Sequence, residues 1–197
     1  MNRSVQRFIP IIFLIVIVGL IIAAAVSVVR IFSNNDANPS SQVVDASYTA
    51  LLSTTTERSV RMTVRGEIVG DEAFRSYRVV ITPSKRDFTR YKGYLEQPLV
   101  NKTYENNVKA YDEFVHALAR ANLAKGTALS GDADDTRGIC ADGILFEFET
   151  MNGTSTVKRL WTTTCGGSKG SLTADVSLVQ QLFLAQIPDA DQYIGKD

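Results

Sequence analysis

The feature that most constrains this chain is an apolar segment near its amino terminus. Residues 8–29 contain no charged side chain. With an α-helical rise of 1.5 Å per residue, these 22 residues would extend about 33 Å, enough to cross a hydrocarbon core of about 30 Å. The segment therefore predicts a transmembrane helix, and we expect the lipid bilayer to be the first partner of this protein.

The charges that flank this segment predict its orientation. Arg3, Arg7 and the terminal amine precede it, whereas only Arg30 follows closely and Asp36 comes soon after. Because basic residues are retained on the cytoplasmic side, we expect residues 1–7 in the cytoplasm and the C-terminal part outside it. The chain would then be a single-pass signal-anchor protein of the cell membrane with an extracytoplasmic domain.

A cleaved signal peptide is the alternative interpretation of the same segment. Ala23, Ala24 and Ala25 form a small-residue cleavage site after an apolar stretch. Apolar residues continue to Val29, however, and a stretch that fills a whole bilayer is more typical of an anchor. Both interpretations export the rest of the chain.

Small residues recur along one face of the expected membrane helix. Gly19, Ala23 and Ser27 are four positions apart, a spacing that lets two membrane helices approach closely. Self-association through this face is one hypothesis, although such residues are common in any membrane helix. Association through this helix would make the chain an accessory subunit of a membrane or surface assembly.

The exported part is expected to contain a tether and one folded domain. Residues 33–41 are polar and lack apolar periodicity, so residues 30–58 are interpreted as a tether. A short helix that Ser41 would cap could form within it, as far as Leu52. Residues 59–197 are long enough for a single domain with its own hydrophobic core.

Apolar and polar residues alternate with a period of two in residues 59–68, Tyr77, Val79 and Ile81 share one face of residues 73–82, and residues 87–94 are interpreted as a third strand. Because short turns separate these stretches, they predict an antiparallel three-strand meander. Residues 95–102 include Pro98 and are expected to form a loop. Thr103 would then cap a long helix whose apolar stripe continues to Leu123.

A hairpin and a short helix are expected to complete the domain. Residues 144–151 and 154–164 flank Asn152 and Gly153, a pair favoured in two-residue type I′ turns. An apolar stripe over residues 176–187 predicts a last helix that Pro188 would end. Strands and helices in this order indicate an α+β fold, an antiparallel sheet covered by a long helix and a short C-terminal helix.

The expected hairpin sets the only two cysteines opposite each other. If Asn152 and Gly153 form the turn, paired residue numbers add up to 305, and Cys140 and Cys165 meet this condition. They would form a non-hydrogen-bonded pair with Cα atoms about 4.5 Å apart, within reach of a disulfide. Export would also supply an oxidising environment. Two free thiols or half of a metal site are the alternatives.

The same register makes further predictions about the hairpin. It pairs Phe148 with Val157 on an apolar face, and Glu147 with Lys158 on the other face. Arg159 would interrupt the apolar face, and the sequence offers no reason for it.

The overall charge is balanced, with 21 basic and 21 acidic side chains, which argues against a nucleic-acid-binding protein. Residues 58–92 nevertheless carry nine Lys or Arg against four acids, and residues 126–197 carry five against ten. One hypothesis is that a basic sheet face binds an anionic envelope polymer. We favour mutual neutralisation of the two halves. The side chains that would form a basic face are Arg61, Arg65, Arg75, Arg78 and Arg90.

Catalytic and metal-binding patterns are weak. His116 is the only histidine and lies within the long predicted helix, where it is more typical of packing than of a nucleophile–base pair. Asp132, Asp134 and Asp135 suggest calcium, but Arg137 stands where the EF-hand turn needs glycine. A solvated acidic loop is the better interpretation, and no cofactor is predicted.

We therefore expect a domain that binds or scaffolds a component of the cell envelope without catalysis. An exported hydrolase that uses carboxylates alone is the alternative from another class. It would need acidic residues from distant segments to meet in a cleft and to have raised pKa values.

Overall fold

The computed structural model describes residues 39–95, 97–167 and 170–194. The chain divides into two compact units, residues 1–43 and 44–197. The apolar segment of residues 8–29, with its small-residue face at Gly19, Ala23 and Ser27, lies outside the described residues. Among the helices that are described, none has the length and apolar character needed to span a membrane.

The first described helix, α2, spans Pro39–Leu52, so Ser41 lies inside the helix that it was expected to cap, and the helix begins three residues earlier than predicted. Its C-terminal part belongs to the second unit. There Leu51 is buried and joins the hydrophobic core. Part of the predicted tether is therefore integral to the folded unit.

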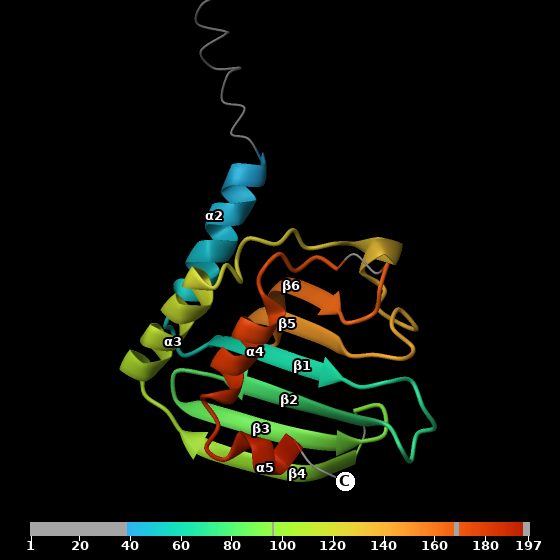
Figure 1. Ribbon diagram of the computed structural model, residues 1–197. Coiled ribbons are helices and arrows are strands. Elements are labelled where there is room, and N and C mark those ends of the chain that lie inside the picture. The colour runs from blue at the N-terminus through green and yellow to red at the C-terminus, as the bar shows by residue number, and fades with distance from the viewer. Residues whose placement is uncertain (1–38, 96, 168–169, 195–197) are drawn as a thin grey trace, which may run out of the picture. The chain divides into compact units, whose positions relative to one another are not determined.

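The second unit is built on one antiparallel sheet of six strands in the order β4-β3-β2-β1-β5-β6 (Figure 1). The sheet and its helices confirm the α+β class. The N-terminal strands join the C-terminal hairpin through the pairing of β1 with β5, in which Met62 lies opposite Phe148. The strands are Arg58–Arg65 (β1), Arg75–Ile81 (β2), Lys85–Lys92 (β3), Gln97–Glu105 (β4), Leu145–Asn152 (β5) and Ser155–Thr163 (β6).

The N-terminal meander has four strands, and the predicted loop at residues 95–102 is wrong. Strand β4 occupies most of it and pairs only with β3. Most of its side chains are exposed, so the apolar alternation that marks a half-buried strand is missing. Pro98 is tolerated because β4 is an edge strand, and it lies beside an irregularity of the β3–β4 register.

The long helix α3 begins later than predicted, at Val108, and ends at Arg120. Its cap is Asn107, whose side-chain oxygen accepts a hydrogen bond from the Ala110 amide at 2.9 Å, and not Thr103, which lies in β4. Two shorter helices follow the hairpin, α4 at Val176–Leu184 and α5 at Ala190–Ile194.

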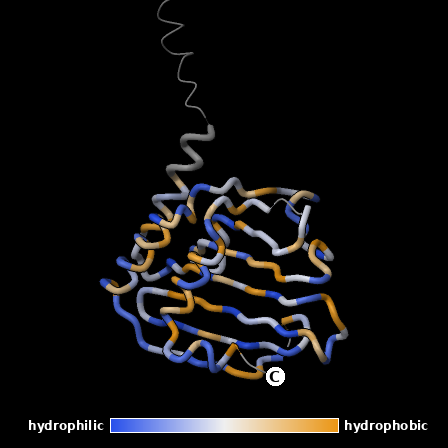
Figure 2. The backbone as a smooth tube through the Cα atoms, in the orientation of Figure 1, coloured by the Kyte–Doolittle hydropathy of each residue, from blue (hydrophilic) through white to orange (hydrophobic). Residues whose placement is uncertain are grey.

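The core lies between the sheet and the helices. Apolar residues alternate with polar ones along several strands (Figure 2), and the apolar set of β1 and β2 faces α3 and α4. Phe183 of α4 stands edge-on to Phe114 of α3, with ring centroids 5.3 Å apart. The largest fully buried members of the core cluster include Leu51, Met62, Ile81, Phe88, Tyr111, Leu118, Phe148 and Phe183.

The hairpin turn lies one residue later than predicted. Asn152 pairs with Ser155, so Gly153 and Thr154 form the turn. Gly153 has a φ of 57°, whereas Asn152 is the last residue of β5 and is not among the residues with positive φ. A glycine with positive φ at the first turn position is the pattern of a type II′ turn, not of type I′.

The predicted hairpin register is consequently wrong. Phe148 pairs with Leu160 instead of Val157, and Glu147 pairs with Trp161 instead of Lys158. Val157 is an extra residue in β6, where the register shifts, which is the two-against-one pattern of a β-bulge. The shift turns Trp161 and Arg159 toward the sheet face opposite the helices.

The cysteines are not opposed within the ladder, because Cys140 precedes β5 and Cys165 follows β6. They are nevertheless joined by a disulfide, with an S–S distance of 2.07 Å and a Cα–Cα distance of 5.5 Å. The bond thus closes the loops at the end of the hairpin far from its turn.

Candidate functional site

A pocket of about 300 Å³ opens where β1 ends and β5 begins. We call it the strand-end pocket. Its volume is at the lower end of the range of small-molecule sites. Apolar side chains from three loops form most of its wall. The residues that line it are Arg65, Gly66, Ile68, Phe74, Tyr94, Thr136, Arg137, Gly138, Ile139, Cys140 and Leu145.

Hydrogen bonds hold the three loops together around the pocket. The Ile68 amide donates to the Ala141 carbonyl at 2.9 Å, which ties the β1–β2 loop to the loop before β5. The Tyr94 hydroxyl donates to the Val69 carbonyl at 2.8 Å, which ties the β3–β4 turn to the β1–β2 loop. The pocket is therefore a preformed feature of the fold.

An aromatic pair forms one wall. The rings of Phe74 and Tyr94 are stacked, with centroids 3.9 Å apart and planes 15° apart. Phe74 is buried, while Tyr94, Ile68 and Val69 are each at least 40% exposed. The pocket thus opens beside an exposed apolar rim formed by these three side chains.

Arg65 is a polar residue of the lining, together with Thr136 and Arg137. Its guanidinium donates to Glu147 through Nε at 3.0 Å and Nη2 at 2.5 Å, and to the Thr136 hydroxyl at 3.3 Å. Glu147 is only 7% exposed. Both nitrogens donate to the same carboxylate oxygen, Oε2 of Glu147, and this charge-assisted pair fixes Arg65 at the end of β1 and secures the loop that carries Thr136.

Arg159 and Trp161 anchor the same loop to β6. Arg159 forms ion pairs with Glu147 and with Asp134, the latter at 2.8 Å, and donates to the Thr136 hydroxyl at 3.1 Å. The Trp161 indole N–H donates to Asp134 at 3.0 Å. These contacts hold the short 3₁₀ helix η1, Gly131–Asp134, against the sheet and explain why a charged residue interrupts the hairpin.

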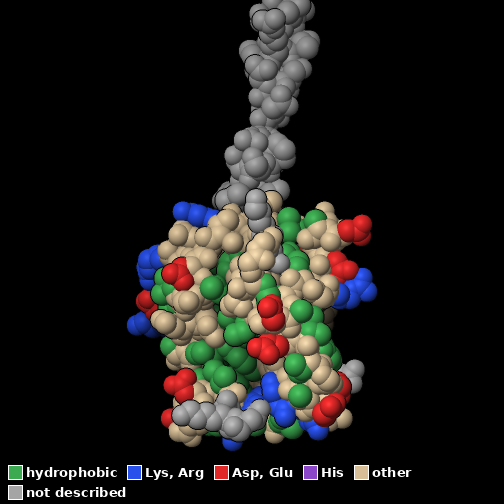
Figure 3. Space-filling view, turned by 45° about the vertical axis from the view of Figure 1, so that its right-hand side comes forward, with side chains coloured by type: hydrophobic (Ala, Val, Ile, Leu, Met, Phe, Trp, Pro, Cys, Tyr) green, Lys and Arg blue, Asp and Glu red, His purple; other side chains and the backbone are tan. Residues whose placement is uncertain are grey.

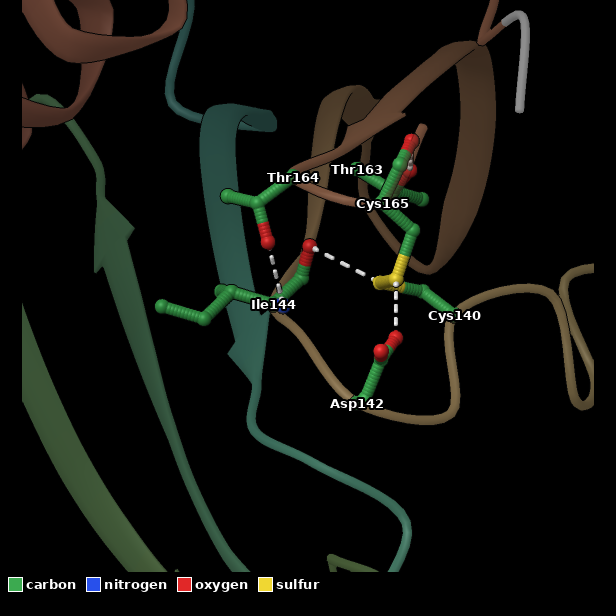
Figure 4. The surroundings of a disulfide bond; sticks show 6 residues. All are labelled: Cys140, Asp142, Ile144, Thr163, Thr164 and Cys165. Carbon is green, nitrogen blue, oxygen red and sulfur yellow. Dashed lines mark hydrogen bonds between the residues drawn. A yellow bond between two sulfur atoms is a disulfide. The ribbon is translucent and has the colours of Figure 1, made fainter. Parts of the chain in front are cut away.

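The disulfide closes the other end of this loop (Figure 4), and Cys140 itself lines the pocket. The Thr164 hydroxyl accepts a hydrogen bond from the Ile144 amide at 2.8 Å beside it. A Cβ atom on Gly143 would lie 2.5 Å from the Thr164 hydroxyl oxygen and 2.9 Å from Cys140 Sγ. Only glycine therefore fits at position 143, where the backbone passes close to the disulfide.

The five arginines expected on one basic face lie on two faces of the sheet. Because side chains alternate between the two faces of a strand, Arg61, Arg65 and Arg78 lie on the sheet face opposite the helices. Arg75 and Arg90 occupy strand positions that face the helices. These two arginines line a second pocket of about 170 Å³. The predicted single basic face is wrong. Figure 3 likewise shows acidic and basic side chains interspersed over the visible surface.

The basic segment, residues 58–92, and the acidic segment, residues 126–197, form ion pairs across the β1–β5 pairing. Arg61 donates to Glu149 at 2.5 Å, beside the contact of Arg65 with Glu147. Burial disfavours the charged form of Glu149, but the hydrogen bond and charge of Arg61 outweigh it, so the pKa of Glu149 is lowered. Arg78 lies over the Tyr91 ring, 5.7 Å from its centroid.

The three aspartates proposed for calcium have separate surroundings. Asp134 binds Arg159 and Trp161, and Asp135 pairs with Arg137 at 2.5 Å. The Arg137 hydrogen bond lowers the pKa of Asp135 to about 2. Asp132 is exposed on η1. In the part of the chain that the structure describes, no three His, Cys, Asp or Glu side chains gather as a metal site.

The sequence named only two residues of the strand-end pocket as candidates, Arg65 and Cys140, and it named them for other roles, a basic face and a disulfide. The residues that build the pocket come from loops that are far apart in the sequence, and only the register of β1 with β5 brings them together. The one indication in the sequence was Arg159. A charged residue on a strand face that is expected to be apolar indicates either that it has a buried ionic partner or that the face was assigned wrongly.

No model of a known protein family matches this chain. The comparison with curated proteins also finds no match.

Proposed function

We propose that this chain is a membrane-anchored, extracytoplasmic binding protein whose folded unit binds its ligand or partner at the strand-end pocket without catalysis. The observation that carries the proposal is the pocket itself: a preformed, largely apolar hollow of about 300 Å³ beside an exposed apolar rim. Preformed apolar pockets with a few polar groups are the usual form of small-ligand sites.

The location outside the cytoplasm is supported by two independent features. The apolar segment of residues 8–29 and its flanking charges favour an N-terminal anchor with export of the rest. The disulfide between Cys140 and Cys165 is compatible with an oxidising compartment.

The state of the carboxylates favours binding over hydrolysis. Glu147 is held between Arg65 and Arg159, and Glu149 is held by Arg61. The lowered pKa of Glu149 is the reverse of what a general acid requires. These carboxylates therefore serve as anchors of the loop and the sheet, which leaves the pocket as the functional feature.

Site-specific photocrosslinking in cells that make the full chain tests the proposal. A benzophenone amino acid at Tyr94, on the pocket rim, should give a discrete adduct. The same group at Leu178, which is 45% exposed on α4, is the matched control and should give none. Equal adducts at both positions, or none at Tyr94, would contradict the proposal, and adducts only from the Gly19 face would favour the accessory-subunit alternative.

A further inference from the structure

We infer that the strand-end pocket binds a small amphipathic monocarboxylate, an apolar or aromatic group that carries one carboxylate. This inference rests on the proposed function and specifies the ligand of the same site. It is drawn from three properties of the pocket: an aromatic wall, two cationic side chains in the lining, and a volume that fits one small molecule.

The apolar end of the pocket suits a ring or a short chain. The stacked pair of Phe74 and Tyr94 offers aromatic surface, and Ile68 and Leu145 add aliphatic contact. Tyr94 keeps its ring in place because its hydroxyl is bound to the Val69 carbonyl. An aromatic ring of the ligand would therefore meet a preordered surface, which reduces the entropy lost on binding.

The polar end of the pocket is cationic. Arg65 and Arg137 line it, and none of its lining residues is an Asp or Glu, although each guanidinium is paired with an acid outside the lining, Glu147 and Asp135 respectively. In the described part of the chain the hydrogen bonds of Arg65 use Nε and Nη2. Its Nη1 group donates to none of the residues that the structure describes, and so remains available to an anion.

Arg137 can exchange its present partner at little cost. Its side chain is 88% exposed and is paired with Asp135 on the surface. Exposed pairs of this kind contribute about 0–1 kcal/mol. A ligand carboxylate that is partly withdrawn from water would therefore compete well with Asp135 for the Arg137 guanidinium.

Size restricts the ligand to one small molecule. A volume of about 300 Å³ admits a phenyl ring with a short acid chain and is too small for a long acyl chain. Because the apolar wall and the two arginines line the same small pocket, a molecule that joins an apolar group to a single negative charge would contact both.

The test is a calorimetric titration of the full chain, kept in detergent, with 3-phenylpropionate. The neutral analogue 3-phenylpropan-1-ol is titrated in parallel, and each ligand is also titrated into detergent alone. We expect saturable 1:1 binding of the acid, with an affinity at least tenfold above that of the alcohol. Equal binding of the two, or no binding of either, would overturn the inference.

Two exposed substitutions assign the binding to this pocket. Arg137→Gln should weaken the acid at least fivefold and leave the alcohol unchanged, whereas Arg120→Gln, an exposed arginine on α3, should change neither. Ile68→Glu should abolish binding of the acid, and Leu178→Glu, at an equally exposed position, should not. Equal effects of a pocket variant and its control would contradict the assignment.

Failure here is distinguishable from failure of the proposed function. If Tyr94 crosslinks a partner in cells while 3-phenylpropionate does not bind, the pocket binds a ligand of another class and only the monocarboxylate inference is wrong.

Discussion

Trp161 donates its indole N–H to Asp134, 3.0 Å away, across the space between β6 and the short helix η1. The indole is almost fully buried, with 1% of Trp161 exposed. Asp134 also forms the ion pair with Arg159. This carboxylate therefore anchors to β6 the loop that forms a wall of the strand-end pocket.

Asp134→Ala should lower the free energy of unfolding by about 1–3 kcal/mol, because it leaves a buried indole N–H without an acceptor. Urea unfolding followed by circular dichroism measures the change. Asp132→Ala is the matched control, since Asp132 is exposed on the same helix, and should stay within about 0.5 kcal/mol of wild type. A cost shared by both variants would contradict the anchoring role.

The lowered pKa of Glu149 predicts how the free energy of unfolding changes as the pH falls. Its pKa in the folded chain is lowered from the ordinary value of 4.5, so its contribution is complete above pH 4.5 and is lost as the pH falls through the folded value. Glu149→Gln should cost about 1–3 kcal/mol at pH 7 and should flatten the stability profile below pH 4.5. Unfolding free energies measured from pH 2 to pH 7 test this.

Glu113 provides the control for the acid profile. It is an exposed acid on α3, and Glu113→Gln should follow the wild-type profile. If Glu149→Gln follows that profile too, the pair with Arg61 does not stabilise the sheet.

The hairpin register predicts which turn residue contributes more to the stability of the folded chain. Gly153 has a φ of 57°, so Gly153→Ala should cost about 1–2 kcal/mol, the strain of a left-handed conformation with a Cβ. Asn152→Ala should stay within about 0.5 kcal/mol, because Asn152 belongs to the strand. Thermal unfolding of the two variants distinguishes them. A larger loss at Asn152 would restore the Asn-Gly turn.

The disulfide should be a structural bond. Cys140→Ala should lower the free energy of unfolding by about 2–5 kcal/mol, and reduction of the wild-type chain should do the same. Thiol titration of the unreduced, denatured chain should find no free thiol. Two titratable thiols before reduction would show that the bond is absent from the protein.

The fold class was predictable because it depends on strands such as β1 and β2, in which apolar residues that face the core recur with a period of two. Strand β4 was not predicted because most of its side chains are exposed, which removes the apolar alternation of a half-buried strand. Pro98 was then the strongest local feature of the sequence, and it indicated a loop. An edge strand needs little apolar surface, and its sequence is accordingly close to that of a loop.

The hairpin shows a different limit. Asn152-Gly153 and Gly153-Thr154 both suit a two-residue turn, and the choice between them changes each pairing by two positions without exchanging the faces of the strands. The bulge at Val157 then shifts the register by one more residue, and this shift exchanges the two faces of β6. The structure joins the predicted cysteine pair, although the register that motivated the prediction is wrong.

The strand-end pocket was beyond sequence reasoning because its walls come from residues about 30 to 75 positions apart, such as Arg65, Tyr94 and Cys140. Long-range strand pairing places them together, and their types are ordinary for loops. Arg159 does not line the pocket but anchors one of its loops, and its charge within the hairpin was the one sign in the sequence that the face assigned to it was wrong.

Labelling of single cysteines in intact cells tests the central claim, membrane anchoring with an extracytoplasmic domain, most directly. In the full chain, Ser40→Cys should react with a membrane-impermeant maleimide and Ser4→Cys should react only after the cells are permeabilised. The mature chain should also retain residues 1–25. Labelling of Ser4→Cys but not Ser40→Cys in intact cells, or a mature N-terminus at Val26, would contradict the account.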